Sequence, residues 1–169
     1  MSGKQKIKPC LWFDNNAEEA VNFYISIFKD SRIHQLSRYG EVGPGKKGTV
    51  MGINFQLEGQ QFMALNGGPI FKFTEAISLY VRCETQAEVD ELWNKLLAGG
   101  GAPSQCGWLK DKFGLSWQII PTALTDMLSD KDPEKSKRVM EAMLKMGKID
   151  IDKLKEAYQA PAGAHASRG

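Results

Sequence analysis

The chain has 169 residues, 42% of them hydrophobic, which is typical of one soluble domain with a buried core. Its 22 basic and 20 acidic residues give a net charge of +2, and no run of Lys and Arg is dense enough to follow a nucleic-acid backbone. No apolar stretch approaches the ~20 residues that cross a bilayer. We therefore expect neither nucleic acid nor a membrane as a partner.

The cysteines give an expectation about the cellular compartment. Cys10, Cys83 and Cys106 are odd in number and follow no CxxC spacing. The first residues lead directly into a strand-like run, without the pattern of a signal peptide. Both observations predict free thiols and a cytoplasmic location.

The first part of the chain has the pattern of a βαβββ module. Residues 7–13 are apolar and β-prone, and Asn16 with Glu19 three positions later resembles the capping box of a helix. Alternating patterns predict three further strands, over residues 33–39, 49–57 and 61–65. A turn at Gly59 joins the last two as a hairpin. The first module is predicted over about residues 6–68.

The same order of elements recurs about 70 residues later in the chain. A strand over residues 77–82 precedes a helix that is capped by Thr85 and ends at three glycines, Gly99 to Gly101. Two more strands are expected, over residues 104–110 and 115–120. The second module is predicted over about residues 75–121. Two such modules side by side would form one curved mixed sheet with a cup-shaped cavity.

A different pattern follows Pro121 and predicts a helical appendage over about residues 123–158. Asp132 followed by proline is a helix opening, and Asp150 is a second one, where Ile149 and Leu154 could pack across the cap as a hydrophobic staple. A methionine-rich stripe in this region is expected to pack on the protein's own sheet or on a sister chain, rather than to form a peptide groove. Residues 159–169 are expected to be a flexible tail. The predicted fold class is α+β.

Several segments together resemble one known family. They are Pro9-Cys10-Leu11-Trp12-Phe13, Ala17-Glu18-Glu19-Ala20 with Phe23-Tyr24, Cys106-Gly107-Trp108-Leu109-Lys110-Asp111, Phe113-Gly114-Leu115-Ser116-Trp117-Gln118-Ile119-Ile120-Pro121 and Lys148-Ile149-Asp150-Ile151. The chain resembles the PhnB-like family, also labelled 3-demethylubiquinone-9 3-methyltransferase, of the glyoxalase/bleomycin-resistance (vicinal oxygen chelate) superfamily. The resemblance implies a single domain over residues 1–158, a homodimer and a ligand pocket in the curved sheet.

The methyltransferase label does not fit the glycine pattern of the chain. Enzymes that use S-adenosylmethionine normally need a glycine-rich turn from a strand into a helix, within an alternating α/β chain. Here Gly99-Gly100-Gly101 follows a predicted helix, and Gly43-Pro44-Gly45 lies in a loop between strands. We therefore do not expect methyl transfer.

The resemblance also implies positions for a divalent metal, one on each of four strands. Alignment places these positions at Pro9, Ala64, Ala76 and Gln118, and only Gln118 carries a donor atom. A shift of one residue would introduce Cys10 and Glu75, but it would also turn those side chains to the opposite face. One neutral amide does not hold a transition metal. We therefore expect no metal and no other cofactor, and His34 and His165 are both expected to be surface residues.

Five residues are candidates for lining the pocket: Trp12, Cys106, Trp108, Ser116 and Gln118. Gln118 and Ser116 share one face of their strand, because side chains alternate. Gln118 could bond to a ligand or to its own neighbours, and the strand tryptophans, Trp117 among them, could form an aromatic wall or belong to the core. Cys106 would be nucleophilic only beside a base or a cation, and is otherwise an inert thiol. Asp111 is expected to form a turn rather than to act as a base.

Three hypotheses about function remain. The first is a metal-free homodimer that binds a small organic or cationic molecule in the sheet cavity. The second is a metal-dependent lyase, isomerase or dioxygenase-type enzyme of the glyoxalase superfamily. The third is a dimeric scaffold for a protein partner. We place binding first, because the replaced ligand positions remove the usual means of catalysis and leave the cavity.

Overall fold

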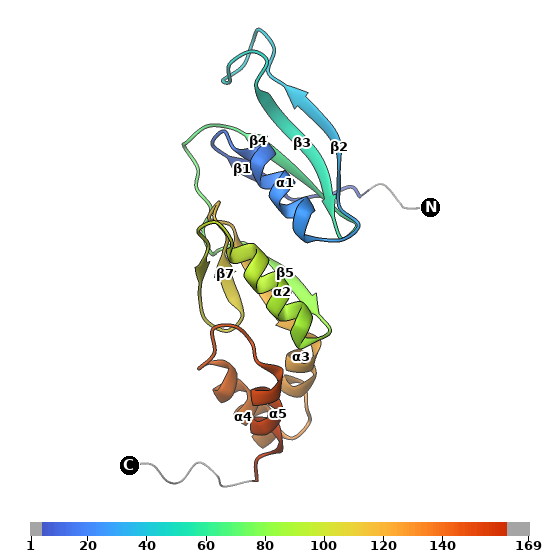
Figure 1. Cartoon of the computed structure of the whole chain (residues 1–169), viewed down its shortest axis with the longest axis vertical. Helices are drawn as coiled ribbons and strands as arrows, with labels where there is room; N and C mark the ends of the chain where they lie inside the picture. The colour runs from blue at the N-terminus through green and yellow to red at the C-terminus, as the bar shows by residue number, and fades with distance from the viewer. Residues whose placement is uncertain (1–4, 162–169) are drawn as a thin grey trace. The chain divides into compact units, whose positions relative to one another are not determined.

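A computed structural model describes residues 5–161, and the chain divides into two compact units, residues 1–73 and 74–169. Each unit contains a four-stranded mixed sheet with a helix packed on it (Figure 1). The predicted α+β class, with two βαβββ-like modules and C-terminal helices, is confirmed. Instead of one continuous sheet, the described strands pair in two sheets of four, one in each unit. His165 and the end of the predicted tail lie outside the described residues.

Unit 1 follows the βαβββ order expected from its sequence. Its elements are β1 (Cys10–Phe13), α1 (Ala17–Ile27), β2 (Arg32–Arg38), β3 (Val50–Leu57) and β4 (Gln60–Asn66). The strand order is β1-β4-β3-β2, with β1 parallel to β4 and the other pairs antiparallel. The β3–β4 hairpin turns at Glu58 and Gly59, whose φ angles of 47° and 76° suit a two-residue turn.

One face of the unit 1 sheet is covered by α1. Its inward residues are fully or nearly buried and alternate along the strands: Leu11, Ile53, Phe55 and Ala64. They pack beneath Ala20, Val21 and Tyr24 of α1, all fully buried. The expected capping box is wrong, because Asn16 makes no side-chain cap. Instead Asn66 Oδ1, from β4, accepts the first helical N–H, that of Ala17, at 2.9 Å.

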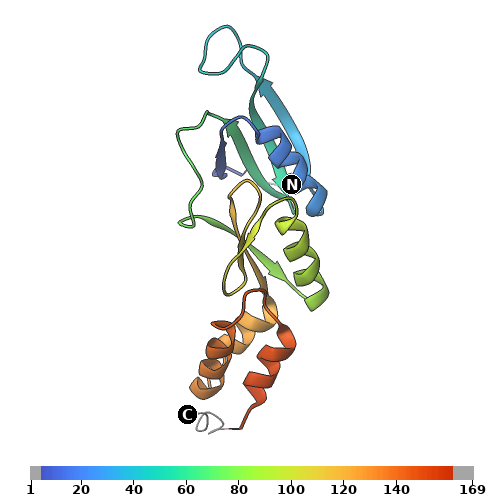
Figure 2. The same cartoon turned by 60° about the vertical axis from the view of Figure 1, so that its left-hand side comes forward.

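Unit 2 repeats the arrangement with shorter strands. Its elements are β5 (Ser78–Cys83), α2 (Gln86–Leu97), β6 (Ala102–Pro103), β7 (Trp108–Lys110) and β8 (Ser116–Pro121), in the order β5-β8-β7-β6. Thr85 caps α2 as predicted, since its side chain accepts a hydrogen bond from Glu88 N at 3.2 Å. Figure 2 shows α2 lying along one side of this sheet.

The strand predicted over residues 104–110 is confirmed for Trp108–Lys110, as β7, and wrong for residues 104–107. Cys106 and Gly107 have φ angles of 57° and 83°, which break the extended backbone. The resulting turn is held from outside the sheet, because Cys106 N donates to Met146 O and Gly107 N to Gly147 O, both at 2.8 Å. The alternation of residue types within 104–107 gave no sign of this tertiary contact.

The face of the unit 2 sheet beneath α2 holds its largest core residue. Trp117 is 2% exposed and shares this face with Leu109 and Ile119, and Trp93 of α2 is buried as well. Its indole N–H donates to Asp111 Oδ2 at 2.9 Å. Asp111 Oδ1 accepts the backbone N–H groups of the following turn, from Phe113 and Leu115. The turn-forming role predicted for Asp111 is confirmed, and Trp117 belongs to the core.

The C-terminal appendage consists of α3 (Thr122–Leu128), α4 (Pro133–Met143) and α5 (Ile151–Gln159), which group together in Figures 1 and 2. Asp132 and Asp150 cap α4 and α5 as predicted. The helices and the end of β8 share one hydrophobic cluster, made of Ile120, Leu124, Val139, Met146, Ile149 and Leu154. The predicted staple of Ile149 with Leu154 lies within it. Of the stripe predicted at helical spacing, Val139 and Met143 pack into this cluster, whereas Met140 and Leu144 are exposed.

No helix in residues 5–161 combines the length and the apolar character that a membrane span requires.

Candidate functional site

The face of the unit 2 sheet opposite α2 gathers polar and aromatic side chains from three strands. The register places them in two rows across the sheet, Ser78-Ser116-Lys110 and Tyr80-Gln118-Trp108. We call these six residues the polar face. Three of the five predicted pocket residues, Trp108, Ser116 and Gln118, lie on it. A third row begins with Ile120, which the appendage covers.

Ser116 is the unusual residue of the polar face. It is 1% exposed, and its Oγ has no hydrogen-bond partner in the described part of the chain. Leaving a buried polar group unpaired costs about 1–3 kcal/mol, so such a group requires an explanation. Next to it along β8, Gln118 Nε2 donates to Ser78 Oγ at 2.9 Å. Gln118 is therefore bonded internally through its nitrogen, the alternative weighed for it.

The aromatic residues of the polar face stay partly accessible. Trp108 is half-buried opposite Gln118, and Tyr80 on the other side is 52% exposed. Partial burial raises the pKa of Tyr80, and the neighbouring Arg82 opposes this effect. At the edge of the face, Lys110 forms an ion pair with Glu75. The result is a row of donors and acceptors flanked by two aromatic rings.

Two predicted pocket residues lie elsewhere. Cys106 is half-buried in the turn before β7, outside the regular alternation of the face. Trp12 belongs to unit 1, where its indole donates to Gly68 O at 2.9 Å and its ring meets Phe71 edge-on at 5.0 Å. A Cβ on Gly67 would lie 2.2 Å from the Trp12 ring, so glycine is required there. Trp12 is thus partly covered by the segment that follows β4.

Ser78 and Tyr80 belong to the polar face but were not among the predicted residues. Their strand alternates them with the inward Leu79 and Val81, and this period-2 pattern is visible in the sequence. What the sequence did not supply was the parallel register with β8 that brings Ser78 to Ser116 and Tyr80 to Gln118.

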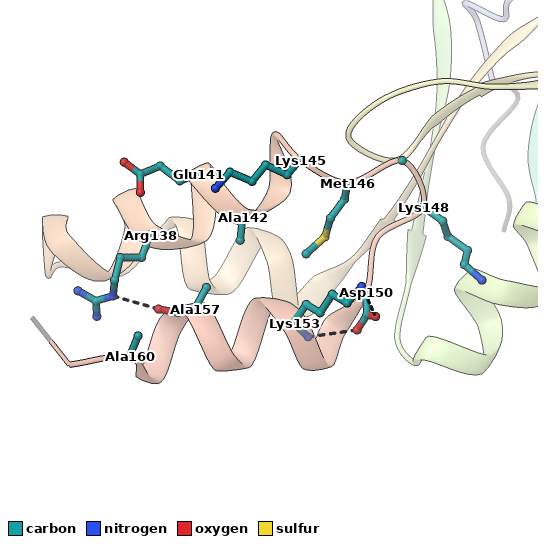
Figure 3. A pocket seen from close by; sticks show the side chains of 11 residues that line it. Arg138, Glu141, Ala142, Lys145, Met146, Lys148, Asp150, Lys153, Ala157 and Ala160 are labelled. Carbon is teal, nitrogen blue, oxygen red and sulfur yellow. Dashed lines mark hydrogen bonds and ion pairs between the residues drawn. The ribbon is translucent and has the colours of Figure 1, made fainter. Parts of the chain in front are cut away.

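A hollow of about 620 Å³ lies between α4 and α5 in the appendage (Figure 3). Several of its charged groups already have protein partners. Arg138 Nε donates to Ala157 O at 3.0 Å, Lys148 pairs with Asp90 at 2.6 Å, and Lys153 lies 3.8 Å from Asp150. The Arg138 bond joins α4 to α5, and the Lys148 pair joins the segment before α5 to α2. A structural role is therefore the better explanation of this hollow.

Comparison with known proteins identifies the family of the chain. The family model described as 3-demethylubiquinone-9 3-methyltransferase matches residues 5–120, from the start of the described chain to the last residue but one of β8. The chain belongs to this family. The match ends before α3, so the helical appendage lies outside the part that the family model covers.

One solved structure supports the assignment to the 3-demethylubiquinone-9 3-methyltransferase family, and a second shares the fold. A PhnB protein from Bacillus cereus, named for the same methyltransferase, is 45% identical, with 70% of this chain and 100% of that chain covered and a TM-score of 0.64. Protein PA1353 from Pseudomonas aeruginosa shares the fold, at 20% identity, with 70% and 98% covered and a TM-score of 0.58. No curated protein matches significantly. The predicted PhnB-like family is confirmed.

The name of the 3-demethylubiquinone-9 3-methyltransferase family refers to an activity that needs its own test. Three junctions lead from a strand into a helix in the described chain, at residues 14–16, 84–85 and 121–122, and none contains glycine. Gly99 to Gly101 follow α2, and Gly43 and Gly45 lie in the β2–β3 loop. These junctions therefore lack the glycine-rich turn that enzymes using S-adenosylmethionine normally have. That the protein does not transfer methyl groups stays a prediction.

The structure also revises the positions considered for a metal in this family member. Ala64 lies on the face of its sheet that α1 covers, whereas Gln118 lies on the uncovered face of its own sheet, so the two positions are not equivalent. The residue of β4 in the equivalent register is Leu65, opposite Trp12, and it offers no donor either. Glu75 is paired with Lys110. Within residues 5–161, no three His, Cys, Asp or Glu side chains come close enough together to hold a metal ion.

Proposed function

We propose that this PhnB-like protein binds a small organic molecule on the polar face of unit 2, as a homodimer and without the catalytic metal usual in the glyoxalase superfamily. The observation that carries the proposal is the buried Ser116 hydroxyl, which has no hydrogen-bond partner among residues 5–161 and lies next to the amide of Gln118. A ligand that bonds to Ser116 would recover the free energy that this group otherwise loses.

The polar face defines the chemistry of the ligand. Ser78 Oγ accepts from Gln118, so its own proton remains available to a ligand, as does the proton of Ser116. Two hydroxyl donors side by side suit a carbonyl, ether or hydroxyl oxygen. Trp108 and Tyr80 on the next row suit an apolar or planar body through ring contacts. A small organic molecule with one oxygen-bearing end fits these requirements.

The homodimer is part of the same proposal. Tyr80 and the half-buried Trp108 present apolar ring surface on a sheet face that α2 does not cover, and binding sites in proteins usually bury most of their ligand. A second copy of the chain is the partner that would close such a face, in line with the paired modules that the family resemblance implies. The three free cysteines favour the reducing cytoplasm as its location.

Native mass spectrometry of the protein purified directly from cells, without chelators, tests this proposal. We expect a dimer that carries a small organic molecule, and we expect the molecule to be lost from a Gln118→Leu variant that still folds. Ser129→Ala, an exposed serine of the appendage, is the matched control and should keep it. Metal analysis of the same sample separates the alternatives: a stoichiometric transition metal would support the metal-dependent enzyme and overturn the metal-free site.

A further inference from the structure

A second hollow, about 380 Å³, lies in unit 1 and is lined by side chains of a different kind. The contributing segments are the residues before β1 and strands β2, β3 and β4. The polar residues that line it are Gln5, Lys8, His34, Gln35, Asn54 and Gln61. Asn54 and Gln61 alternate with the buried Phe55 and Phe62, so they lie on the sheet face that α1 does not cover. This hollow is separate from the polar face of unit 2.

A β-bulge brings two consecutive side chains of β2 to this hollow. Ile33 pairs with Phe55 and Gln35 with Asn54, so His34 is an extra residue in the ladder. Both His34 and Gln35 therefore line the hollow, although neighbours in a regular strand point to opposite faces. The imidazole is fixed in place, because His34 Nε2 lies 2.8 Å from Gln56 Oε1. Gln56 is in turn oriented by its two hydrogen bonds to Asp30.

The wall formed by the N-terminal segment is also held in place. Gln61 N donates to Gln5 Oε1 at 3.1 Å, and Gln5 Nε2 donates to Gln61 O at 3.3 Å. These two bonds join the segment before β1 to β4, much as an added strand would be joined. Lys8, three residues further on, is thereby kept near Asn54.

The charge of Lys8 is what distinguishes this hollow. Its Nζ lies 2.5 Å from Asn54 Oδ1, which is a neutral partner. Five other lysines of the described chain are paired with carboxylates: Lys47, Lys95, Lys110, Lys148 and Lys153. No Asp or Glu is among the described residues that line the hollow. The positive charge of Lys8 is therefore uncompensated at short range, and it acts on the neighbouring Cys10, where it opposes the rise in pKa that burial causes.

We infer that this hollow binds a small oxyanion, a carboxylate or a phosphate group. The Lys8 ammonium supplies the charge, and the side-chain amides of Asn54, Gln35 and Gln61 supply neutral N–H donors around it. A cation surrounded by amide donors, without an acid, suits an anion because charge-assisted hydrogen bonds to oxygen are the strongest of their kind. Asn54 already has its oxygen turned to Lys8, so its NH₂ group is the part left to donate elsewhere.

Titration of the full-length protein with inorganic phosphate and, separately, with acetate tests the inference, with chloride used to hold ionic strength constant. Backbone amide chemical shifts measured by NMR should saturate at residues of β2 and β3 around the hollow. Lys8→Gln should weaken binding about tenfold or more. Lys6→Gln is the matched control, because Lys6 is an exposed lysine two residues away that does not line the hollow, and it should change the affinity little.

A second variant separates a built site from general surface charge. Asn54→Asp keeps the shape of the side chain and Lys8, but it places a carboxylate beside the ammonium, so anion binding should be lost while the melting temperature holds. Saturation by phosphate alone would identify a phosphate site, and saturation by both anions an oxyanion site without that selectivity. Equal loss in Lys8→Gln and Lys6→Gln, or no saturation by either anion, would overturn the inference. Neither result would bear on ligand binding at the polar face.

Discussion

The two units are built on the same plan but differ on the face that their helix leaves uncovered. Aligning Leu11-Trp12-Phe13 with Leu79-Tyr80-Val81 makes Met63 and Leu65 of β4 equivalent to Ser116 and Gln118 of β8. Unit 1 thus carries two apolar side chains where unit 2 carries a hydroxyl and an amide. A repeated backbone has kept its architecture while the chemistry of this face has diverged, which is why fold and function must be argued separately.

The helix-covered faces differ as well, in the way that they fill their cores. The position of Ala64 in unit 1 corresponds to Trp117 in unit 2. In unit 1 the volume comes instead from Tyr24 of the helix and Phe55 of the next strand, both fully buried. The two cores therefore carry their large side chains on different elements, which is compatible with the tolerance of cores for volume-conserving exchanges.

The variant with the largest expected effect on stability is Trp117→Ala. Removing a fully buried indole, together with its bond to Asp111, should lower the free energy of unfolding by about 3–5 kcal/mol, measured by denaturant unfolding. Trp108→Ala, on the other face of the same sheet and only half-buried, is the control and should cost clearly less. Equal losses in the two variants would mean that the two faces of unit 2 are equally buried.

Unit 1 has no counterpart of the helical appendage. Leu154→Ala tests whether the appendage unfolds together with the rest of unit 2. Leu154 is fully buried in the cluster that includes Ile120 of β8, so its truncation should cost about 2–4 kcal/mol in a single unfolding transition. Leu144→Ala, where the side chain is 59% exposed, should have little effect. A separate early transition in Leu154→Ala would instead make the appendage an independently unfolding part.

Sequence patterns predicted the elements of both units well, because most of them depend on local signals. Thr85 with Glu88, Asp132 and Asp150 lie at helix starts that short-range capping chemistry determines. The predictions failed where a distant residue decides the local structure. Asn66 replaces the expected cap of α1, and Met146 and Gly147 hold the turn at Cys106.

The candidate site was predictable only in part for the same reason. Alternation along β8 placed Ser116 and Gln118 on one face, as the register of the structure has them. Ser78 and Tyr80 join them through a parallel pairing that no local pattern encodes. Whether Trp12 and Cys106 contribute to binding stays a prediction, since neither belongs to these two rows.

Cys10 in β1 and Cys83 in β5 allow the two units to be compared through the pH dependence of stability. Burial raises the pKa of Cys83 from 9.0 to about 12, with Glu88 and Glu84 adding to the effect. Because the pKa of Cys83 is higher in the folded state, the thiol ionises first in the unfolded state as the pH rises. Its contribution to the free energy of unfolding is therefore complete below pH 9 and is lost as the pH rises toward 12. Near pH 10 the loss should be about 1 kcal/mol.

The measurement is the difference in unfolding free energy between pH 8 and pH 10 for the wild type and for Cys83→Ala. The wild type should lose more than the variant does, since only its unfolded state gains a thiolate at this position. Cys10→Ala is the comparison: partial burial, opposed by Lys8, also raises the pKa of this thiol, so this variant should lose some of the pH dependence but less of it than Cys83→Ala does. The same pH dependence in wild type and Cys83→Ala would contradict the shifted pKa.

The smallest expected effect bears most directly on the polar face. If the Ser116 hydroxyl is buried without a partner, Ser116→Ala should raise the free energy of unfolding of ligand-free protein by up to about 1 kcal/mol, because the variant no longer buries an unpaired group. Ser78→Ala is the matched control in the same row, and it should be neutral or destabilising because Ser78 accepts from Gln118. Destabilisation by Ser116→Ala would show that the hydroxyl already has a partner within the protein, and the polar face would then lose the unpaired group on which its proposed ligand binding depends.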